Sequence, residues 1–550
     1  MWMDEETRKD ILFDELLSRF QPYTLVGKRK ARNLPPFLPG QEKEWKQLLD
    51  EQEILQREFL MHPNQTSVIR SALEHLPDID GIIDQMKSKE VPSLTEWFQL
   101  KQFLWHSYIW MRSLQEIGLN RFSFTQAEIG TCELLLRQLN PFEPLQPSFA
   151  LYDEFDPELK EARQQRTAIE REIQKQNELR AQAIEEKCSI RRNRFREWVV
   201  QRGTEEEQAL LQDDQVQLVR ETVYDRIFVL KPSKEQEVLQ QEQMNWNRMI
   251  EQLEQKVLEK LTAFFQPYLE WLKQTEEKIV SFDLLWARVR AAESWQGVKP
   301  ELSDESLVIE GGIHPLIAIQ LEEQQSSFIP IDLEIKPGVT IIIGPNMGGK
   351  TVTLKTIGMI VALAQYGFFV PANTCRLPLF SWIASLMGDQ QDVKKGLSTF
   401  GAEMVRLSGY LQNHTIGLLL LDEIGRGTNP VEGSALSVAV TRYLVDQGYY
   451  AVHVTHFRDV VQVEGIRGYR MGGLKNLGDW HVHFGHGEEI ARSLQEQMDY
   501  RLLPLEAGDT IPEQALILAE RLGLPSLIVE EARRRMQREG DWHGAETETR

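Results

Sequence analysis

A glycine-rich octapeptide sets the architecture of the second half of the chain: Gly344-Pro345-Asn346-Met347-Gly348-Gly349-Lys350-Thr351. It follows an apolar run, Val339 to Ile343, and precedes a helical pattern from Val352 to Leu363. A strand, a tight turn and a helix N-terminus in this order surround an anion with backbone N–H groups and the positive end of the helix dipole. In such a turn Lys350 reaches the β- and γ-phosphates of a nucleotide, and Thr351 holds Mg²⁺. The octapeptide and the adjoining Val352 therefore predict a site for a nucleoside triphosphate.

An acidic pair follows a second buried strand. The run Gly417-Leu418-Leu419-Leu420-Leu421 ends in Asp422-Glu423. An Asp at the carboxyl end of a strand can hold Mg²⁺, and the adjacent Glu can orient or deprotonate an attacking water. Two acids that cap the N-terminus of a helix would give the same pattern. The phosphate-binding turn upstream favours the catalytic interpretation.

Two further segments carry polar groups next to apolar runs. Thr455-His456 follows the run Tyr450 to Val454, so His456 is expected to contact the γ-phosphate, whereas His453 within the strand is expected to be structural. A polar turn opens a helix at Ser398-Thr399-Phe400-Gly401-Ala402-Glu403-Met404. Its N–H and hydroxyl groups can bind a phosphate. The residues alone leave open whether that phosphate belongs to the same chain or to a partner.

Composition restricts the classes of protein to consider. The chain has 550 residues, enough for about three or four domains. Its three cysteines, Cys132, Cys188 and Cys375, show no metal-ligand spacing, and no apolar run is long enough to span a bilayer. Residues Met1 to Asp10 lack the apolar part of a signal peptide, so a cytoplasmic location is expected. The net charge of −21 means that nucleic-acid binding would need a local basic patch.

The patterning predicts an α + α/β protein. A short lead (1–20) precedes a helical core (21–155), in which apolar residues recur at a spacing of three and four. Residues 156–280 predict two long antiparallel helices joined by a small β-rich tip, with a kink at Pro267. Residues 281–305 return to the core, and 306–538 alternate strands with helices around a parallel sheet. The polar tail, 539–550, is predicted to be disordered.

Four ordered blocks together resemble the MutS family of ABC-like ATPases. They are Gly344–Thr351, Ser398–Met404, Leu418–Thr428 and Thr455-His456. Outlying matches extend the resemblance over residues 306–538: His314-Pro315, Phe328–Asp332, Gly367–Pro371 and Arg521–Pro525. In the first half, Thr24, Gly27, Lys28 and Arg29 resemble the start of the MutS core domain, and the paired helices resemble its lever and clamp.

The resemblance implies a homodimer with composite ATP and Mg²⁺ sites. Ser398 of one chain would meet the γ-phosphate bound by Lys350 of the other, and the Gly425–Glu432 loop would cross the interface. Lys350, Glu423 and His456 would be the catalytic residues, and Thr351 and Asp422 the metal ligands. Phe328 would stack on the adenine, with a core position as the alternative.

The chain also departs from the family pattern. Mismatch-recognising relatives carry a Phe-x-Glu wedge in an N-terminal domain, followed by a connector domain, whereas the core-like sequence begins here near residue 20. Phe13-Asp14-Glu15 matches the wedge by chance, because no such domain surrounds it. No basic C-terminal nuclease domain of the second bacterial MutS branch is recognised, although Gly388–Gln391 and Asn429–Gly433 look closer to that branch. Mismatch reading by a wedge is not expected.

Two kinds of partner remain open. Basic residues on the first arm, with Phe195 and Trp198 among them, would suit DNA phosphates; these are Lys187, Arg191, Arg192, Arg194, Arg196 and Arg202. Alternatively, the same arginines would pair with Glu185, Glu186 and Glu205–Glu207 on a solvated face. Short MutS-like proteins also resemble the ATPase component of systems that reactivate cobalamin-dependent amino-acid aminomutases. The acidic balance favours such a protein client, and no membrane partner is expected.

Overall fold

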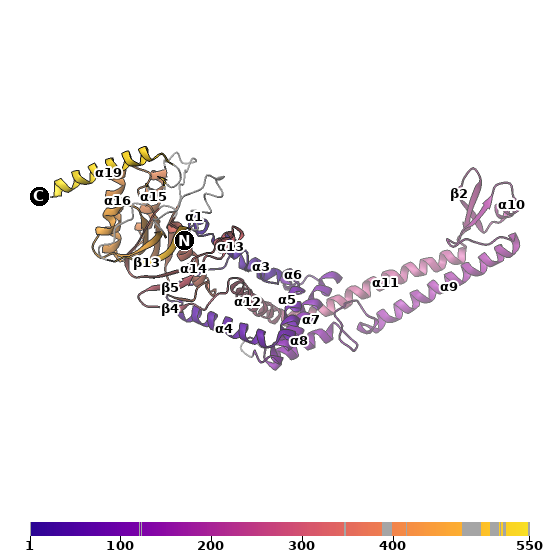
Figure 1. The fold of residues 1–550 in the computed structure, drawn as a ribbon. Helices are drawn as coiled ribbons and strands as arrows, with labels where there is room; N and C mark the ends of the chain where they lie inside the picture. The colour runs from indigo at the N-terminus through magenta and orange to yellow at the C-terminus, as the bar shows by residue number, and fades with distance from the viewer. Residues whose placement is uncertain are drawn as a thin grey trace. The chain divides into compact units, whose positions relative to one another are not determined.

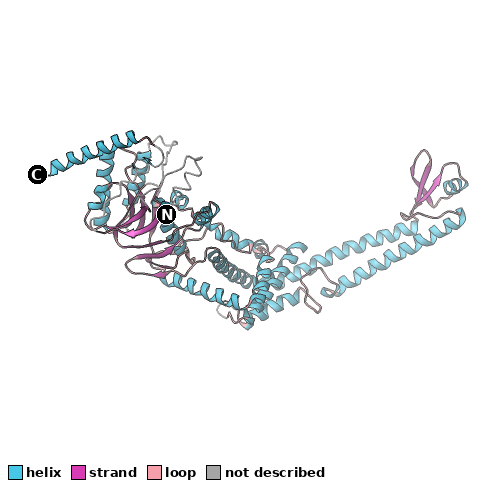
Figure 2. Cartoon of the chain, in the orientation of Figure 1, coloured by secondary structure: helices cyan, strands magenta, loops and turns pink. Residues whose placement is uncertain are grey.

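The computed structural model describes residues 2–119, 122, 124–345, 348–387, 399–413, 415–475, 497–506, 516, 519–520 and 524–547. The chain divides into two compact units, which are described separately (Figure 1). The first unit comprises Met1–Ser67 and Val280–Arg550, and the second comprises Val68–Ile279. Figure 2 shows that helices dominate the second unit and that most of the strands belong to the first.

A six-stranded sheet forms the centre of the first unit. Its strand order is β13-β12-β7-β11-β10-β9, in which only the edge strand β13 is antiparallel to its neighbour. The strands are β7 (Gly338–Ile343), β9 (Trp382–Leu386), β10 (Gly417–Asp422), β11 (Tyr450–Thr455), β12 (Arg467–Leu474) and β13 (Met498–Pro504). The central strands are continuous apolar runs because both faces of the sheet are covered.

Helices cover both faces of this sheet. On one face, α14 (Lys350–Gln365) packs against Leu418 and Leu420 of β10. On the other face, the alternate residues Leu419 and Leu421 pack with α15 (Thr399–Leu411) and α16 (Pro430–Gln447). The arrangement of a mostly parallel sheet between helices confirms the predicted mixture of helical and α/β structure.

Further elements complete the first unit. A four-stranded sheet has the order β4-β8-β5-β6. Its strands are β4 (Glu301–Leu302), β5 (Leu307–Gly312), β6 (Ile331–Ile335) and β8 (Thr374–Leu377). The helices are α1 (Glu5–Asp10), α2 (Phe13–Leu17), α3 (Leu25–Ala31), α4 (Glu42–Met61), α13 (Pro315–Glu323), η3 (Arg458–Gln462) and α19 (Ser526–Thr547). The sequence predicted a disordered tail from residue 539, but α19 continues to Thr547.

The N-terminal lead packs on the same unit rather than standing apart. The Trp2 carbonyl accepts a hydrogen bond from the Ile383 N–H at 2.8 Å, next to β9. The Ser385 hydroxyl donates to Asp10 at 2.5 Å, and Ile11 is fully buried. The predicted boundary at residue 20 therefore separates segments that share one core.

The second unit is helical apart from its tip. Its helices are α6 (Asp80–Lys87), α7 (Leu94–Glu116), α8 (Gln126–Gln138), η1 (Asp153–Phe155), α9 (Pro157–Cys188), α10 (Glu205–Gln212), α11 (Lys234–Phe265) and η2 (Gln266–Tyr268). Two helices contain the unit boundaries, α5 (Pro63–Glu74) and α12 (Leu269–Glu293). Pro267 lies in the short 3-10 turn that separates α11 from α12. Among the helices that the structure describes, none combines the length and apolar character needed to span a membrane.

Helices α9 and α11 run antiparallel along the arm (Figure 1). At one end Lys260 pairs with Asp156 at 2.7 Å, and at the other Arg180 donates to Gln236 at 3.5 Å. Between these points Arg163 pairs with Glu254 at 2.7 Å. Polar pairs thus link the two helices at both ends and between them, in addition to the apolar residues that each helix buries.

The tip differs from a simple continuation of the first arm helix. Helix α9 ends at Cys188, and Ser189 adopts a left-handed conformation (φ 54°). Three antiparallel strands then form a sheet in the order β1-β3-β2: β1 (Trp198–Gln201), β2 (Val216–Glu221) and β3 (Asp225–Leu230). Trp198 and Val200 alternate with exposed neighbours and enter a small core with Phe228. Alternation of buried and exposed side chains with a period of two is typical of a strand.

Candidate functional site

Three motif segments meet because their strands are neighbours. Strand β11 lies between β7 and β10, and all three are parallel. Thr455 is in register with Ile343, and Asp422 is in register with Val454. The residues that follow these strands therefore come together at one edge of the sheet, where α/β folds bind ligands.

The glycine-rich turn leads directly into α14. Gly349 is the N-cap of this helix and has a φ of 90°, a conformation that is costly for any residue with a Cβ. Lys350 is buried, and its Nζ donates to the Gly344 carbonyl at 2.9 Å. This hydrogen bond folds the lysine back over the turn, where its ammonium and the helix N-terminus favour the same anion. Asn346 and Met347 lie outside the described residues.

The two residues expected to hold Mg²⁺ are in contact. The Thr351 hydroxyl donates to Asp422 Oδ2 at 2.6 Å, joining the start of α14 to the end of β10. Burial raises the pKa of Asp422 above its ordinary value, and the Thr351 hydrogen bond opposes that shift. A hydroxyl and a carboxylate oxygen are the hard ligands that Mg²⁺ prefers. The pair therefore fits a Mg²⁺ that accompanies a bound triphosphate.

Glu423 lies among three basic side chains. Its Oε1 is 3.3 Å from Lys350 Nζ and 3.6 Å from His456 Nδ1, and its Oε2 is 3.4 Å from an Arg426 guanidinium nitrogen. The hydrogen bond with His456 is the largest cause that lowers the pKa of Glu423 to about 2, and the charge of Lys350 adds to it. The carboxylate is thus ionised and able to accept a proton or a hydrogen bond from water.

The backbone holds Glu423 in place. Its φ of 54° is left-handed, and its N–H donates to the Val454 carbonyl of the neighbouring strand at 2.9 Å. A left-handed residue that is not glycine is uncommon and is often found where a side chain must be aimed. Gly425 follows in the same loop, and a Cβ there would lie 2.9 Å from the Gly433 carbonyl.

A pocket with a volume of about 880 Å³ adjoins these groups. Phe328, the predicted adenine-stacking residue, lines it together with Pro345, Val352 and the residues from Gly348 to Thr351. Residues of β12 and β13 and the adjoining Lys475 line it as well, namely Met471, Lys475, Met498, Asp499, Tyr500 and Arg501. Sequence reasoning missed this second group because no motif marks β12 and β13. Arg426, which also lines the pocket, was named only as part of the Gly425–Glu432 loop.

The remaining predicted residues have distinct environments. His456 is 40% exposed beside Glu423, whereas His453 is fully buried. The ring of His453 forms hydrogen bonds with the Thr441 hydroxyl at 3.0 Å and the Ser437 hydroxyl at 3.4 Å, as a structural residue would. Ser398 lies outside the described residues, so its position relative to any nucleotide stays a prediction.

Four of the basic residues proposed for DNA binding, Arg191, Arg192, Arg194 and Arg196, lie in the loop 189–197 of the second unit. The other two are paired within the arm, Lys187 with Asp213 at 2.8 Å and Arg202 with Glu221 at 2.6 Å. Arg192 is occupied, since its side chain is 12% exposed and pairs with Glu185 at 3.0 Å and Glu178 at 2.9 Å. Arg191, Arg194 and Arg196 are exposed. The alternative of pairing within the arm therefore describes Arg192, Lys187 and Arg202, while Arg191, Arg194 and Arg196 remain candidates for an external anion.

The turn, the acidic pair and the parallel sheet define a class of protein, the nucleotide-binding domain of an ABC-like ATPase. Residues 340–538 match the family model described as MutS domain V. This match, with the relatives described next, supports a MutS-family ATPase domain in this chain. The resemblance drawn from the sequence motifs is thereby confirmed.

Several curated proteins are similar to this chain, and each is named Endonuclease MutS2. One from Synechocystis sp. is 34% identical over 329 residues, which is 55% of this chain and 37% of that protein. One from Thermotoga petrophila is 32% identical over 295 residues, 52% of this chain and 35% of that protein. One from Geobacillus sp. is 32% identical over 309 residues, 55% of this chain and 36% of that protein. The chain therefore spans about a third of the length of the curated relatives it matches.

Proposed function

We propose that this chain is an ATPase that hydrolyses ATP to ADP and phosphate and couples the nucleotide state to movement of its helical arm. The observation that carries the proposal is the contact of Lys350 and Glu423, 3.3 Å apart, beside the Thr351–Asp422 pair. One site thus contains a phosphate-binding cation, two metal ligands and an ionised carboxylate. These are the groups that phosphoryl transfer to water requires.

Each residue has a separate role in this proposal. Bound Mg²⁺ would supply charge neutralisation at the triphosphate oxygens. Thr351 and Asp422 hold the metal ion, and Lys350 binds phosphate oxygens. Glu423 orients the attacking water and accepts its proton, while His456 fixes the Glu423 carboxylate and contacts the γ-phosphate. Phe328 contributes an aromatic face to the pocket for the adenine.

We further propose that the working form is a homodimer with composite sites. Ser398 of one chain would complete the site that contains Lys350 of the other. The Gly425–Glu432 loop supports this proposal, since its residues Val431 and Arg426 are strongly exposed and available to a second chain. Closure of the two ATPase domains around ATP would then be the step that changes the position of the arms.

DNA is the proposed cargo. The names of the relatives describe endonucleases, and Arg191, Arg194 and Arg196 give this chain an exposed basic loop at the tip of its arm. A protein client such as an aminomutase is the alternative outcome. Stimulation of ATP hydrolysis by duplex or branched DNA, and its absence with an aminomutase, would support the first; the reverse result would support the second.

The ATPase itself is tested with Glu423→Gln, which removes the negative charge and keeps the shape. ATP binding is expected to persist, while turnover falls by about 10²- to 10⁴-fold, as when a general base is lost. The matched control is Glu464→Gln, an exposed glutamate on the turn next to Gly338, at the opposite edge of the sheet. Hydrolysis at the parent rate by Glu423→Gln would refute the assigned role of Glu423, and no ATP binding by the parent chain would refute the proposed function.

A further inference from the structure

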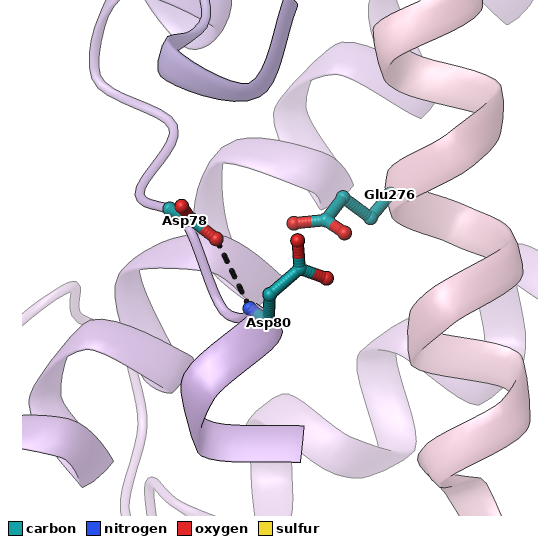
Figure 3. Close-up of side chains that lie close together, drawn as sticks. All are labelled: Asp78, Asp80 and Glu276. Carbon is teal, nitrogen blue, oxygen red and sulfur yellow. Dashed lines mark hydrogen bonds between the residues drawn. The ribbon is translucent and has the colours of Figure 1, made fainter. Parts of the chain in front are cut away.

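The acidic cluster of the second unit is held by contacts inside that unit. Figure 3 shows Asp78 in the loop before α6, Asp80 at the start of α6 and Glu276 on α12. The Asp78 carboxylate accepts a hydrogen bond from the Asp80 N–H at 3.1 Å, and Lys273 pairs with both Asp80 and Glu276. These contacts join α6 to α12, so the cluster has a structural explanation.

Glu403 of α15 is an acidic residue that contacts the loop of the nucleotide site. Its carboxylate accepts a hydrogen bond from the N–H of Gly425, two residues after Glu423. Burial raises the pKa of Glu403 above its ordinary value, and the hydrogen bond from Gly425 opposes that shift. Hydrogen bonds from a backbone N–H to a carboxylate are among the stronger ones in proteins. Glu403 can therefore hold this part of the loop in place.

The first turn of α15 makes a second contact with the same loop. The backbone of Gly427 packs closely on Phe400, because a Cβ added at Gly427 would lie 3.3 Å from the Phe400 Cβ. Phe400 and Glu403 are three positions apart, so both project from one side of the helix. Helix α15 therefore supports the loop on either side of Arg426, whose guanidinium pairs with Glu423.

The rest of α15 is fastened to the sheet and to the N-terminal lead. Leu407 is buried in an apolar cluster with residues of β10. Arg406 donates to the Ser385 carbonyl of β9 at 2.9 Å and pairs with Glu6 of the lead at 2.7 Å. Arg406 and Leu407 lie three and four positions after Glu403. These contacts therefore fix the helix about one turn away from Glu403.

We propose that Glu403 is a positioning residue for ATP hydrolysis, which keeps the Glu423 carboxylate directed at the attacking water by holding the Gly425 N–H. Glu423 has a left-handed φ of 54°, and such a conformation persists where surrounding contacts hold it. The Arg426 N–H donates to the Glu423 carbonyl at 3.1 Å, so residues 423–426 form one tight turn. A displacement of Gly425 would move Glu423 as well. This inference rests on the proposed ATPase function and on the role of Glu423 in it.

Two substitutions separate the reach of Glu403 from its charge. Glu403→Gln keeps an oxygen acceptor at the same distance, so kcat for ATP hydrolysis by the full chain should stay within about threefold of the parent value. Glu403→Asp keeps the charge but is one methylene shorter, so kcat should fall by about tenfold or more while KM for ATP changes by less than about twofold. The matched control is Glu464→Asp, at an exposed glutamate outside the site, and it should leave both constants unchanged.

A double variant shows whether Glu403 acts through Glu423. Added to Glu423→Gln, Glu403→Asp should cause no further loss of the residual rate, which single-turnover hydrolysis measures. A general structural defect would lower the rate by the same factor in both backgrounds, and that result would overturn the proposal. A parent-like kcat for Glu403→Asp, or for Glu403→Ala if Glu403→Asp folds poorly, would overturn it too. A parent chain without ATPase activity would refute the proposed function and this inference together, whereas an active parent with either earlier result would refute only the role of Glu403.

Discussion

Two histidines three positions apart show how a residue's place on a strand decides its chemistry. His453 points into the core from β11, where Ser437 and Thr441 are its partners. His456 follows the end of the same strand and reaches Glu423 at the edge of the sheet. The sequence could separate the two because side chains alternate along a strand and ligand sites lie beyond its carboxyl end.

His453 predicts a loss of stability in acid. Burial lowers its pKa to about 4, below the ordinary value of 6.5. Between these two values the unfolded chain binds a proton that the folded chain does not, so the free energy of unfolding falls as the pH falls from about 6.5 to about 4. The expected contribution is about 3 kcal/mol. Denaturant unfolding, followed between pH 7 and pH 4, measures it.

Two variants isolate this contribution. His453→Gln should flatten the pH dependence by removing the titrating ring. Thr441→Val keeps the buried ring and removes one of its partners, so it should lower stability and retain the steep dependence on pH. If the free energy of unfolding depends on pH in the same way for the parent and for His453→Gln, other groups cause the acid sensitivity. One such group is His314, because burial lowers its pKa to about 4 as well.

At the scale of elements, the strand–turn–helix unit around Lys350 could be predicted because its signal is local. An apolar run, three glycines and a helical pattern follow one another within about 25 residues, and the structure places β7, the turn and α14 there. The pocket wall from β12 and β13 could not be predicted in this way. Tyr500 and Arg501 reach the pocket through an antiparallel pairing about 150 residues downstream, which no local pattern encodes.

Alanine substitutions at Gly349, before α14, and at Gly409, within α15, are expected to change stability in opposite directions. Gly349→Ala places a Cβ at φ 90° and only 3.2 Å from the Tyr500 ring, so it should cost about 1–2 kcal/mol and weaken ATP binding about tenfold. Gly409→Ala lies inside α15 with no atom within 4 Å of the new Cβ, and should stabilise the protein by about 0.5–1 kcal/mol. Denaturant unfolding and titration with a fluorescent ATP analogue measure both effects. Similar effects of the two variants would mean that the turn tolerates a side chain.

The arm tip predicts different outcomes for neighbouring arginines. Arg192 pairs with Glu178 and Glu185 and lies 5.7 Å from the Trp198 ring centroid, so Arg192→Ala should destabilise the tip. Replacing Arg191, Arg194 and Arg196 together by alanine should leave stability nearly unchanged and weaken DNA binding. If each contacts one phosphate, the slope of log K against log salt concentration should become less negative by about 2.7.

A matched triple variant controls for the loss of charge. Lys160, Arg171 and Lys175 are exposed along α9, and their replacement by alanine removes the same charge away from the tip. An equal change of slope in both triple variants would mean that DNA responds to the overall charge of the chain and makes no specific contact with the loop. A chain that binds no DNA at low salt would instead favour the protein client.

At the scale of the whole molecule, the sequence predicted the family and the mixture of helical and α/β structure, but its predicted boundaries differ from the compact units. The lead and part of the helical core belong with the ATPase domain, because residues 1–67 pack into the same unit as residues 280–550. No local sequence pattern indicates such packing between distant segments.

The proposed dimer predicts that two inactive variants restore activity when they are mixed, which a monomer could not do. Lys350→Ala and Ser398→Ala should each abolish hydrolysis in a homodimer. If Ser398 serves the partner's nucleotide, a mixed dimer of the two variants contains one site with both defects and one site with none. An equimolar mixture that exchanges subunits should then regain about a quarter of the parent rate, because half of the dimers are mixed and each has one intact site.

The control is the parent chain mixed with Lys350→Ala, which shows whether one intact site in a dimer turns over by itself. If Ser398 served the nucleotide of its own chain, every site in the two-variant mixture would carry one defect, and no activity would return. The control mixture keeps about a quarter of the parent rate from parent homodimers alone and about half if mixed dimers are active. About half the parent rate in the control, with none in the two-variant mixture, would refute the composite site and leave the ATPase assignment standing. About half the parent rate in the control and about a quarter in the two-variant mixture would make the second chain part of the catalytic unit. Closure of the dimer would then follow directly from ATP binding.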